Sequence, residues 1–169
     1  MFQTIDKSAG DLTLQRSAWM ALLARAPLAL LEPALGHRAG DRPHWLRAPE
    51  TGLMMVQARV GGTGERFNLG EVTVTRCALR LGEGSAQAAV GVAYVLGRSH
   101  RQARLAAMAD ALLQNPAHLA ELDQCLLGPI RQHLDLERAQ RLARAETTKV
   151  DFFTVARESG DNDDSGDDA

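Results

Sequence analysis

Apolar residues recur at helical spacing in the first part of the chain. From about Leu12 to Ala26 they return every three or four positions, which predicts a helix with one buried face. Pro27 fits the first turn of a second, shorter helix, and Gly36 fits its end. The sequence therefore predicts two N-terminal helices.

The period changes from about 3.6 to two in the middle of the chain. Alternating apolar and polar residues predict four strands, over 44–48, 53–60, 71–81 and 88–96. Turn-forming residues separate them at Pro49–Gly52, Gly61–Gly64 and Gly82–Ser85. Four consecutive strands with short turns are typical of an antiparallel meander.

Helical spacing returns after Gly97. Ser99 with Gln102 three places later is a capping box, and the helix that it opens is expected to end before Asn115–Pro116. A further helix is predicted over 117–127, and Gly128–Pro129 is expected to separate it from a long helix over 130–146. The fold class is therefore α+β, with N-terminal helices, a four-stranded antiparallel sheet and C-terminal helices.

The charge of the chain is unevenly distributed. Six of its 21 acidic residues fall within 158–169, which holds no base, whereas the preceding residues carry 15 acids against 19 bases. We expect a flexible leader over 1–11, a single domain over 12–157 and a disordered acidic tail over 158–169. The basic domain suits an anionic ligand or an acidic protein partner.

Two cysteines, Cys77 and Cys125, fall on apolar faces and in no metal or redox spacing, which predicts two buried thiols. The sequence shows no signal peptide and no apolar run of membrane-spanning length. We therefore expect a cytoplasmic protein without membrane insertion.

Two glycine-containing segments are candidates for binding. Gly61–Phe67 lacks the lysine of a phosphate-binding P-loop, so it is either a hairpin loop with positive φ angles or a binding or subunit contact. Gly97–Arg101 places positive charge at a helix N-terminus. There Arg98 and Arg101 either bind an anion or pair with carboxylates of this chain or of a partner.

Catalytic signatures are missing from the sequence. It has no Gly-x-Ser-x-Gly elbow, and its five histidines do not share a helical metal-ligand spacing. The basic side of the last helix lacks interleaved aromatics, so no nucleic-acid binding is expected. Phe152–Phe153 either anchors a partner subunit or packs into the domain's own core.

Five ordered runs stand out between Ala48 and Arg157, namely 48–53, 57–71, 74–81, 94–98 and 149–157. Together they resemble the small G subunit of bacterial carbon–phosphorus lyase systems, over roughly Arg16 to Arg157. This resemblance implies a core complex with subunits H, I and J and with ATP-binding-cassette proteins K and L. The complex displaces adenine from MgATP with an alkylphosphonate and yields ribose 1-phosphonate 5-triphosphate.

The resemblance implies an enzyme subunit of an alpha-D-ribose 1-methylphosphonate 5-triphosphate synthase, without independent catalytic activity. It implies no cofactor on this chain alone, with MgATP as a substrate of the complex, and it assigns no catalytic or metal residue. A purely structural scaffold subunit and a stand-alone anion-binding module are the alternatives. Three of the expected substrate or subunit contacts, Arg59, Arg66 and Arg98, are candidates for binding triphosphate or phosphonate. The full set of expected contacts is Arg59, Gly61, Gly62, Thr63, Gly64, Glu65, Arg66, Phe67, Arg98, Phe152 and Phe153.

Overall fold

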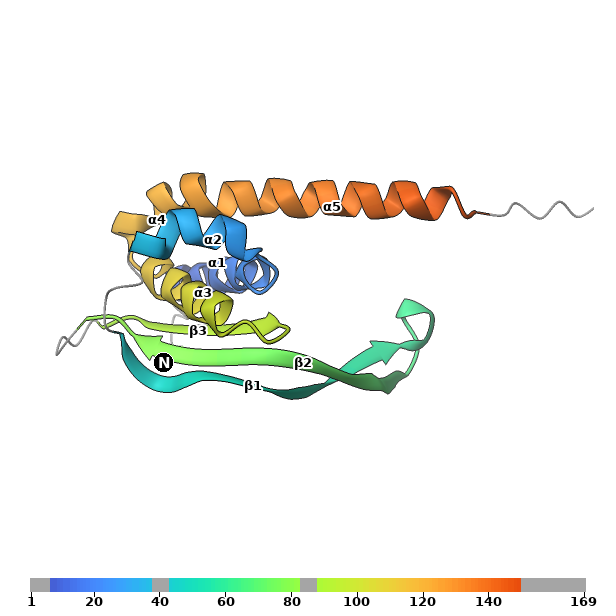
Figure 1. The fold of residues 1–169 in the computed structure, drawn as a ribbon, viewed down its shortest axis with the longest axis horizontal. Helices are drawn as coiled ribbons and strands as arrows, with labels where there is room; N and C mark the ends of the chain where they lie inside the picture. Colours follow the sequence, from blue (N-terminus) through green and yellow to red (C-terminus); the bar gives the residue numbers. More distant parts are fainter. Residues whose placement is uncertain (1–6, 38–42, 83–87, 150–169) are drawn as a thin grey trace, which may run out of the picture.

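The computed structural model describes residues 7–37, 43–82 and 88–149. A sheet forms one layer, and the helices pack in two tiers over one of its faces (Figure 1). The first tier holds α3 (His100–Leu113) and α1 (Lys7–Leu23), which contact the sheet, and the second holds α2 (Leu28–Leu35), α4 (Pro116–Leu122) and α5 (Gly128–Glu146). The expected α+β class is confirmed.

The described sheet has three antiparallel strands in the order β1 (His44–Arg59), β2 (Arg66–Arg80) and β3 (Val90–Leu96). The prediction of four strands was wrong, because Pro49–Gly52 lies inside β1. The register shifts between Arg47 and Glu50, so Ala48 and Pro49 form a bulge in one long strand, and Glu50–Gly52 pair with β2. Pro49 has no N–H to donate to a ladder, and a bulge accommodates it without breaking the strand. The carboxylate of Glu50 then accepts hydrogen bonds from Arg76 at 2.8 Å and Arg47 at 2.7 Å.

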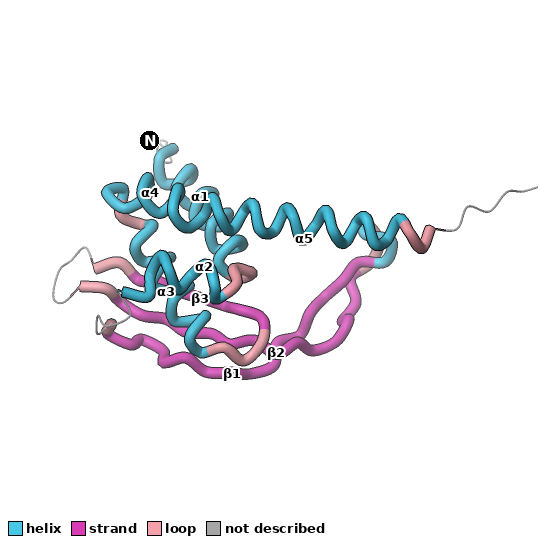
Figure 2. The backbone as a smooth tube through the Cα atoms, turned by 45° about the horizontal axis from the view of Figure 1, so that its top comes forward, coloured by secondary structure: helices cyan, strands magenta, loops and turns pink. Residues whose placement is uncertain are grey.

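The β1–β2 hairpin is much longer than β3. Strand β3 pairs only with Val74–Arg80, whereas β1 and β2 continue to the pair Arg59 and Arg66. The distal half of the hairpin therefore projects beyond β3 as a two-stranded arm, and α5 extends in the same direction above it (Figures 1 and 2). We call residues 53–73 the hairpin arm.

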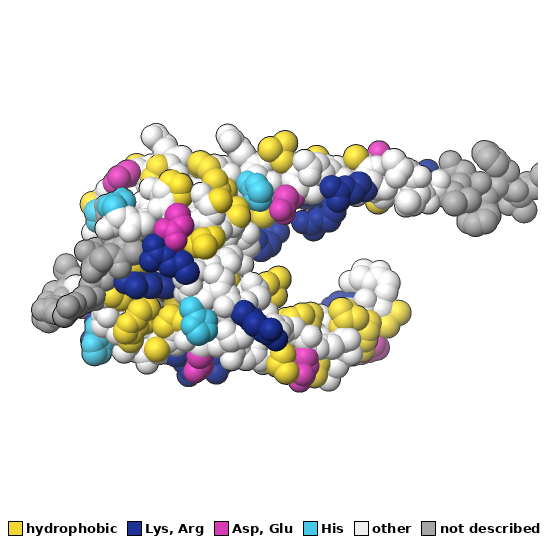
Figure 3. Space-filling model, in the orientation of Figure 1, with side chains coloured by type: hydrophobic (Ala, Val, Ile, Leu, Met, Phe, Trp, Pro, Cys, Tyr) yellow, Lys and Arg dark blue, Asp and Glu magenta, His cyan; other side chains and the backbone are white. Residues whose placement is uncertain are grey.

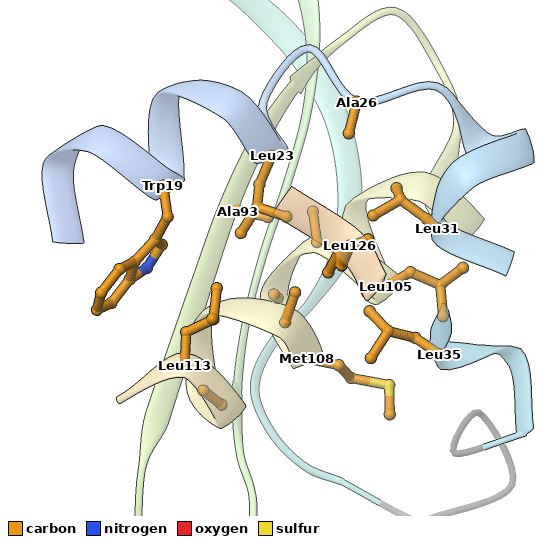
Figure 4. Close-up of a cluster of buried hydrophobic side chains, with 14 of the residues drawn as sticks. Trp19, Leu23, Ala26, Leu31, Leu35, Ala93, Leu105, Met108, Leu113 and Leu126 are labelled. Atoms are coloured by element: carbon orange, nitrogen blue, oxygen red, sulfur yellow. The ribbon is translucent and has the colours of Figure 1, made fainter. Parts of the chain in front are cut away.

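The core lies between the sheet and α3. Leu79 and Val95 of the sheet and Leu105 and Met108 of α3 are almost fully buried. Figure 4 shows Leu105 and Met108 within this cluster. Burying one such side chain stabilises the fold by about 1.5–3 kcal/mol. Helix α3 begins as predicted, because Ser99 accepts a hydrogen bond from the backbone N–H of Gln102. The helix therefore has a fixed start at the edge of the sheet.

The junction of α4 and α5 differs from the prediction. Gly128 has helical φ and ψ of −58° and −57°, so Gly128–Pro129 does not interrupt the helix. Instead, a π-helical turn, Asp123–Leu127, joins α4 to α5. A π-helical turn contains more residues than an α-helical one, and across it Leu126 and Leu127 are buried on the same side as Leu122. Cys125 is exposed, so its predicted burial was wrong, whereas Cys77 is buried as expected.

No described helix alone is long and apolar enough to cross a membrane. Leu14–Leu23 and Leu28–Leu35 meet the length and composition requirement only as a pair, and they are bent by 114°.

Candidate functional site

The tip of the hairpin arm is a tight glycine turn. Gly61 and Gly62 have φ angles of 58° and 83°, which confirms the expected positive φ. The turn closes through a hydrogen bond of 2.8 Å from the Gly64 N–H to the Val60 carbonyl. Thr63 directly follows the 3-10 turn Val60–Gly62. The Glu65 carbonyl accepts a hydrogen bond of 3.2 Å from the backbone N–H of Val60. A side chain at position 64 would meet the Val60 carbonyl oxygen at 2.8 Å, so the tip requires glycine there.

Arg59 and Arg66 are direct partners across the ladder at the base of this turn. Arg59 donates from Nη1 to the Gly64 carbonyl at 3.0 Å. Like charges placed directly opposite one another destabilise a strand pair. Within the described part of the chain, neither guanidinium forms an ion pair with a carboxylate. The tip therefore offers two adjacent cations to an anionic group from outside the domain.

One face of the hairpin arm is apolar. Met54 pairs with Val72 and Ala58 pairs with Phe67, so their side chains share a face. Met54 and Phe67 are 44% and 43% exposed, and on the opposite face Leu53 and Met55 are 66% and 48% exposed. A two-stranded ribbon is marginally stable in water unless another element covers it. An exposed apolar strip on such a ribbon is typical of a protein interface.

Arg98 lies apart from the arginine pair at the tip. Leu96, two residues before Arg98, pairs with Val74 of β2. Val74 lies eight residues after Arg66, which is a distance of roughly 26 Å along the strand. The structure therefore does not bring Arg59, Arg66 and Arg98 into one site. Arg101 pairs with Glu32 through two bonds of 2.7 and 2.8 Å, and this contact lowers the pKa of Glu32.

A hydrogen-bond chain fixes the root of the hairpin arm to α3. The Thr75 hydroxyl donates to the Gly97 carbonyl at 2.7 Å, so its oxygen must accept from Thr51, 3.0 Å away. Because the Thr51 hydroxyl has donated its single proton to Thr75, it can only accept from His100, and His100 Nε2 donates to it at 3.1 Å. This direction requires a proton on Nε2 of His100. The chain joins β1, β2 and the first turn of α3.

A cleft lies where α5 leaves the body of the domain. It has a volume of about 860 Å³, and we call it the α5 cleft. Figure 3 shows a hollow between α5 and the hairpin arm, with Lys and Arg side chains gathered along the side of α5 that borders it. The lining comes from α1, the α1–α2 loop, β3, α3 and α5, and it comprises Leu22, Ala24, Arg25, Leu96, Gln102, Arg131, Leu134, Asp135, Glu137, Arg138 and Arg141.

The remaining candidate residues, Phe152 and Phe153, lie outside the described residues, so their contacts stay a prediction. Among the residues that the structure describes, no group of three or more His, Cys, Asp or Glu side chains could hold a metal ion.

The sequence identified the tip because its residues are contiguous. It missed the Thr51–His100 contact and most of the α5 cleft, because these sites join residues from distant segments. The one sequence signal for the cleft was the helical spacing of Arg131, Arg138 and Arg141, which marked a basic side of α5.

Comparison with known proteins identifies a family and a relative to which this chain is similar. The protein family described as "Phosphonate metabolism protein PhnG" matches residues 14–158. A relative from Rhizobium meliloti (strain 1021), "Alpha-D-ribose 1-methylphosphonate 5-triphosphate synthase subunit PhnG", is 43% identical over 145 residues. The match covers 85% of this chain and 89% of the relative.

Proposed function

The chain belongs to the family of the phosphonate metabolism protein PhnG, and we propose that it is a subunit of an alpha-D-ribose 1-methylphosphonate 5-triphosphate synthase. The observation that carries this function is the 43% identity to the synthase subunit over most of both chains. The chain then contributes to an enzyme as part of a complex, in the catabolism of organic phosphonates.

The uncovered hairpin arm supports a subunit role. Its apolar face around Met54 and Phe67 is left exposed by the domain, whereas β3 and the part of β2 that pairs with it are packed under α3. Burial of aromatic and long apolar side chains dominates the energetics of protein interfaces. We propose that this face packs against another subunit, and that the arginine pair at the tip, which alternates to the opposite face of the ribbon, contacts an anionic group of the complex.

The proposed partners are the H, I and J subunits of the carbon–phosphorus lyase core, together with the ATP-binding-cassette proteins K and L. In the proposed reaction, a phosphonate oxygen bonds to C1′ of the ribose of MgATP, the N-glycosidic bond breaks, and adenine leaves with a proton on that nitrogen, taken from the phosphonate or from solvent. MgATP is thus a substrate of the assembled complex, which we place in the cytoplasm. The partners supply the reacting groups, and this chain completes or holds their site.

Arg59, Arg66 and Arg98 are the proposed contacts to triphosphate or phosphonate. Arg59 and Arg66 can act together on one anionic group because they are paired at the tip. Arg98 belongs to a separate surface at the end of β3. Guanidinium groups bind phosphate oxygens in a bidentate manner, which suits either position.

Co-expression of the tagged chain with its candidate partners tests the proposal. We expect a stoichiometric complex that releases adenine from MgATP when methylphosphonate is added, and we expect adenine release to fail when this chain is omitted. Recovery of the chain as a lone monomer in the presence of all partners would contradict the proposed function.

Charge reversal in the assembled complex separates substrate contact from scaffolding. The variants are Arg59→Glu, Arg66→Glu and Arg98→Glu, with the exposed Arg80→Glu as a matched control. A substrate contact lowers turnover about tenfold or more while the complex still assembles. Unchanged turnover in all three variants would remove the arginines from the substrate site and leave a scaffold role.

A further inference from the structure

The α5 cleft carries more positive than negative charge. Four arginines and two carboxylates line it. Arg131 is paired with Asp123 at 2.6 Å, and Arg141 is paired with Glu137 at 3.3 Å. Arg25 and Arg138 form no ion pair with any carboxylate in the described ranges, and Asp135, which also lines the cleft, pairs with no base there. The positive charge of these two arginines is therefore only partly offset within the cleft.

An acidic segment follows α5 in the same chain. Residues 158–169 hold six of the 21 acidic residues and no basic residue. The family match ends at residue 158, so the segment lies beyond the part of the chain that is shared with the family. Its charge is opposite to that of the cleft, and its attachment point is the helix that forms one wall of the cleft.

We propose that the acidic segment 158–168 binds in the α5 cleft of its own chain, with its carboxylates against Arg25 and Arg138. The contact is electrostatic, and the cleft is its binding site. In this state the segment shields the basic side of α5 from other anions. A partner subunit or an anionic ligand that uses the same arginines must displace it.

The geometry permits this contact. Helix α5 ends at Glu146, and Arg138 lies eight residues earlier, or about 12 Å back along the helix. Lys149 still donates a backbone hydrogen bond of 3.2 Å to Glu146, and the acidic segment begins nine residues after it, a length of chain that spans at most about 30 Å. The linker can therefore reverse direction and return to the cleft with slack.

The covalent link makes a weak interaction sufficient. A short covalent tether between a segment and its site gives an effective concentration in the millimolar range. The acidic segment thus occupies the cleft for about half the time even if a separate peptide of the same sequence binds with a millimolar Kd. Because the charged groups border solvent, salt above physiological strength should screen the contact.

Paramagnetic relaxation in the full chain tests the contact directly. A nitroxide is attached to Ser165→Cys in a Cys125→Ser background, in which the remaining thiol, Cys77, is buried. We expect broadened backbone amide signals at Arg25, Arg131 and Arg138, and recovery of these signals in about 0.5 M NaCl. Equal broadening over the whole surface, or none near the cleft, would overturn the proposal.

A charge-reversal pair shows whether the cleft itself is the site. In Arg25→Glu/Arg138→Glu, we expect broadening near the cleft to fall at least threefold. Arg80→Glu, which changes an exposed arginine on β2 that does not line the cleft, should leave it unchanged. An equal loss of broadening in both variants would mean that the segment responds only to the net charge of the domain, and the assignment of the cleft as its binding site would be wrong. These measurements use the chain alone, so their failure leaves the proposed subunit function untouched.

Discussion

The indole Nε1 of Trp19 donates a hydrogen bond of 2.9 Å to the fully buried carboxylate of Asp110. The same carboxylate accepts two bonds from Arg16, at 3.1 and 2.7 Å, and one from the backbone N–H of Val92, at 2.9 Å. These four bonds join α1, α3 and β3. A buried carboxylate is stable only when its oxygens are satisfied in this way.

Replacement of Asp110 should therefore destabilise the domain. Asp110→Ala leaves the Trp19 and Val92 donors without their acceptor, and we expect a loss of about 3–5 kcal/mol in the free energy of unfolding. Urea denaturation measures this loss. Asp135→Ala, at an exposed position on α5, is the control and should change the free energy by less than about 0.5 kcal/mol. Equal effects at the two positions would contradict the role of the network.

Gly91 allows β3 to approach α3 closely. A side chain there would lie 1.9 Å from the Ala107 carbonyl oxygen, so Gly91→Ala forces the helix away from the sheet. We expect a loss of about 3 kcal/mol or more, seen as a fall in Tm of roughly 6–12 °C. Gly52→Ala is the matched control, because no atom lies within 4 Å of a side chain at that position. A variant at position 91 as stable as this control would show that the close approach is not required.

The two thiols should differ in reactivity. Burial raises the pKa of Cys77 to about 11, so almost none of it is thiolate near neutral pH. Cys125 is exposed in the π-helical turn. We expect iodoacetamide at about pH 8 to modify Cys125 in the native chain and Cys77 only after unfolding. Mass spectrometry of the labelled peptides measures the order, and rapid native labelling of Cys77 would disprove its burial.

Acid should weaken the Glu32–Arg101 contact. The hydrogen bonds from Arg101 lower the pKa of Glu32 below 4.5. A depressed pKa in the folded state contributes stability above the unfolded pKa, and this contribution is lost as the pH falls through the folded pKa. Glu32→Gln should therefore lose less stability than the wild type when the pH is lowered from about 5 to 3. Curves of unfolding free energy against pH that run parallel for the two proteins would exclude a contribution of Glu32 to this pH dependence.

Local signals in the sequence predicted much of this fold. The Ser99–Gln102 spacing located the start of α3, and the glycines at positions 61 and 62 located the hairpin turn. Both features depend on neighbouring residues, so a single sequence contains them. The alternation of Thr75, Cys77 and Leu79 likewise identified the buried face of β2.

The errors have a common physical cause. A proline and a glycine close together, as at Pro49–Gly52, indicate a turn, but pairing with β2 holds the segment extended with a bulge. Similarly, Gly128–Pro129 indicates a helix end, yet the preceding π-helical turn accommodates the proline and rotates Cys125 outward. In both cases long-range packing overrides a local preference. The α5 cleft was missed for the related reason that its walls come from five separate segments.

The apolar face of the hairpin arm carries the central claim that the chain acts as a subunit. The most direct test is co-purification of the partners with Met54→Asp/Phe67→Asp, compared with wild type and with Leu14→Asp, which changes a side chain exposed on α1. We predict that the double variant keeps the Tm of the isolated chain within a few degrees, because both side chains are already partly exposed, and that it no longer recovers the partners. The control should recover them in full. A double variant that still assembles stoichiometrically would contradict the account.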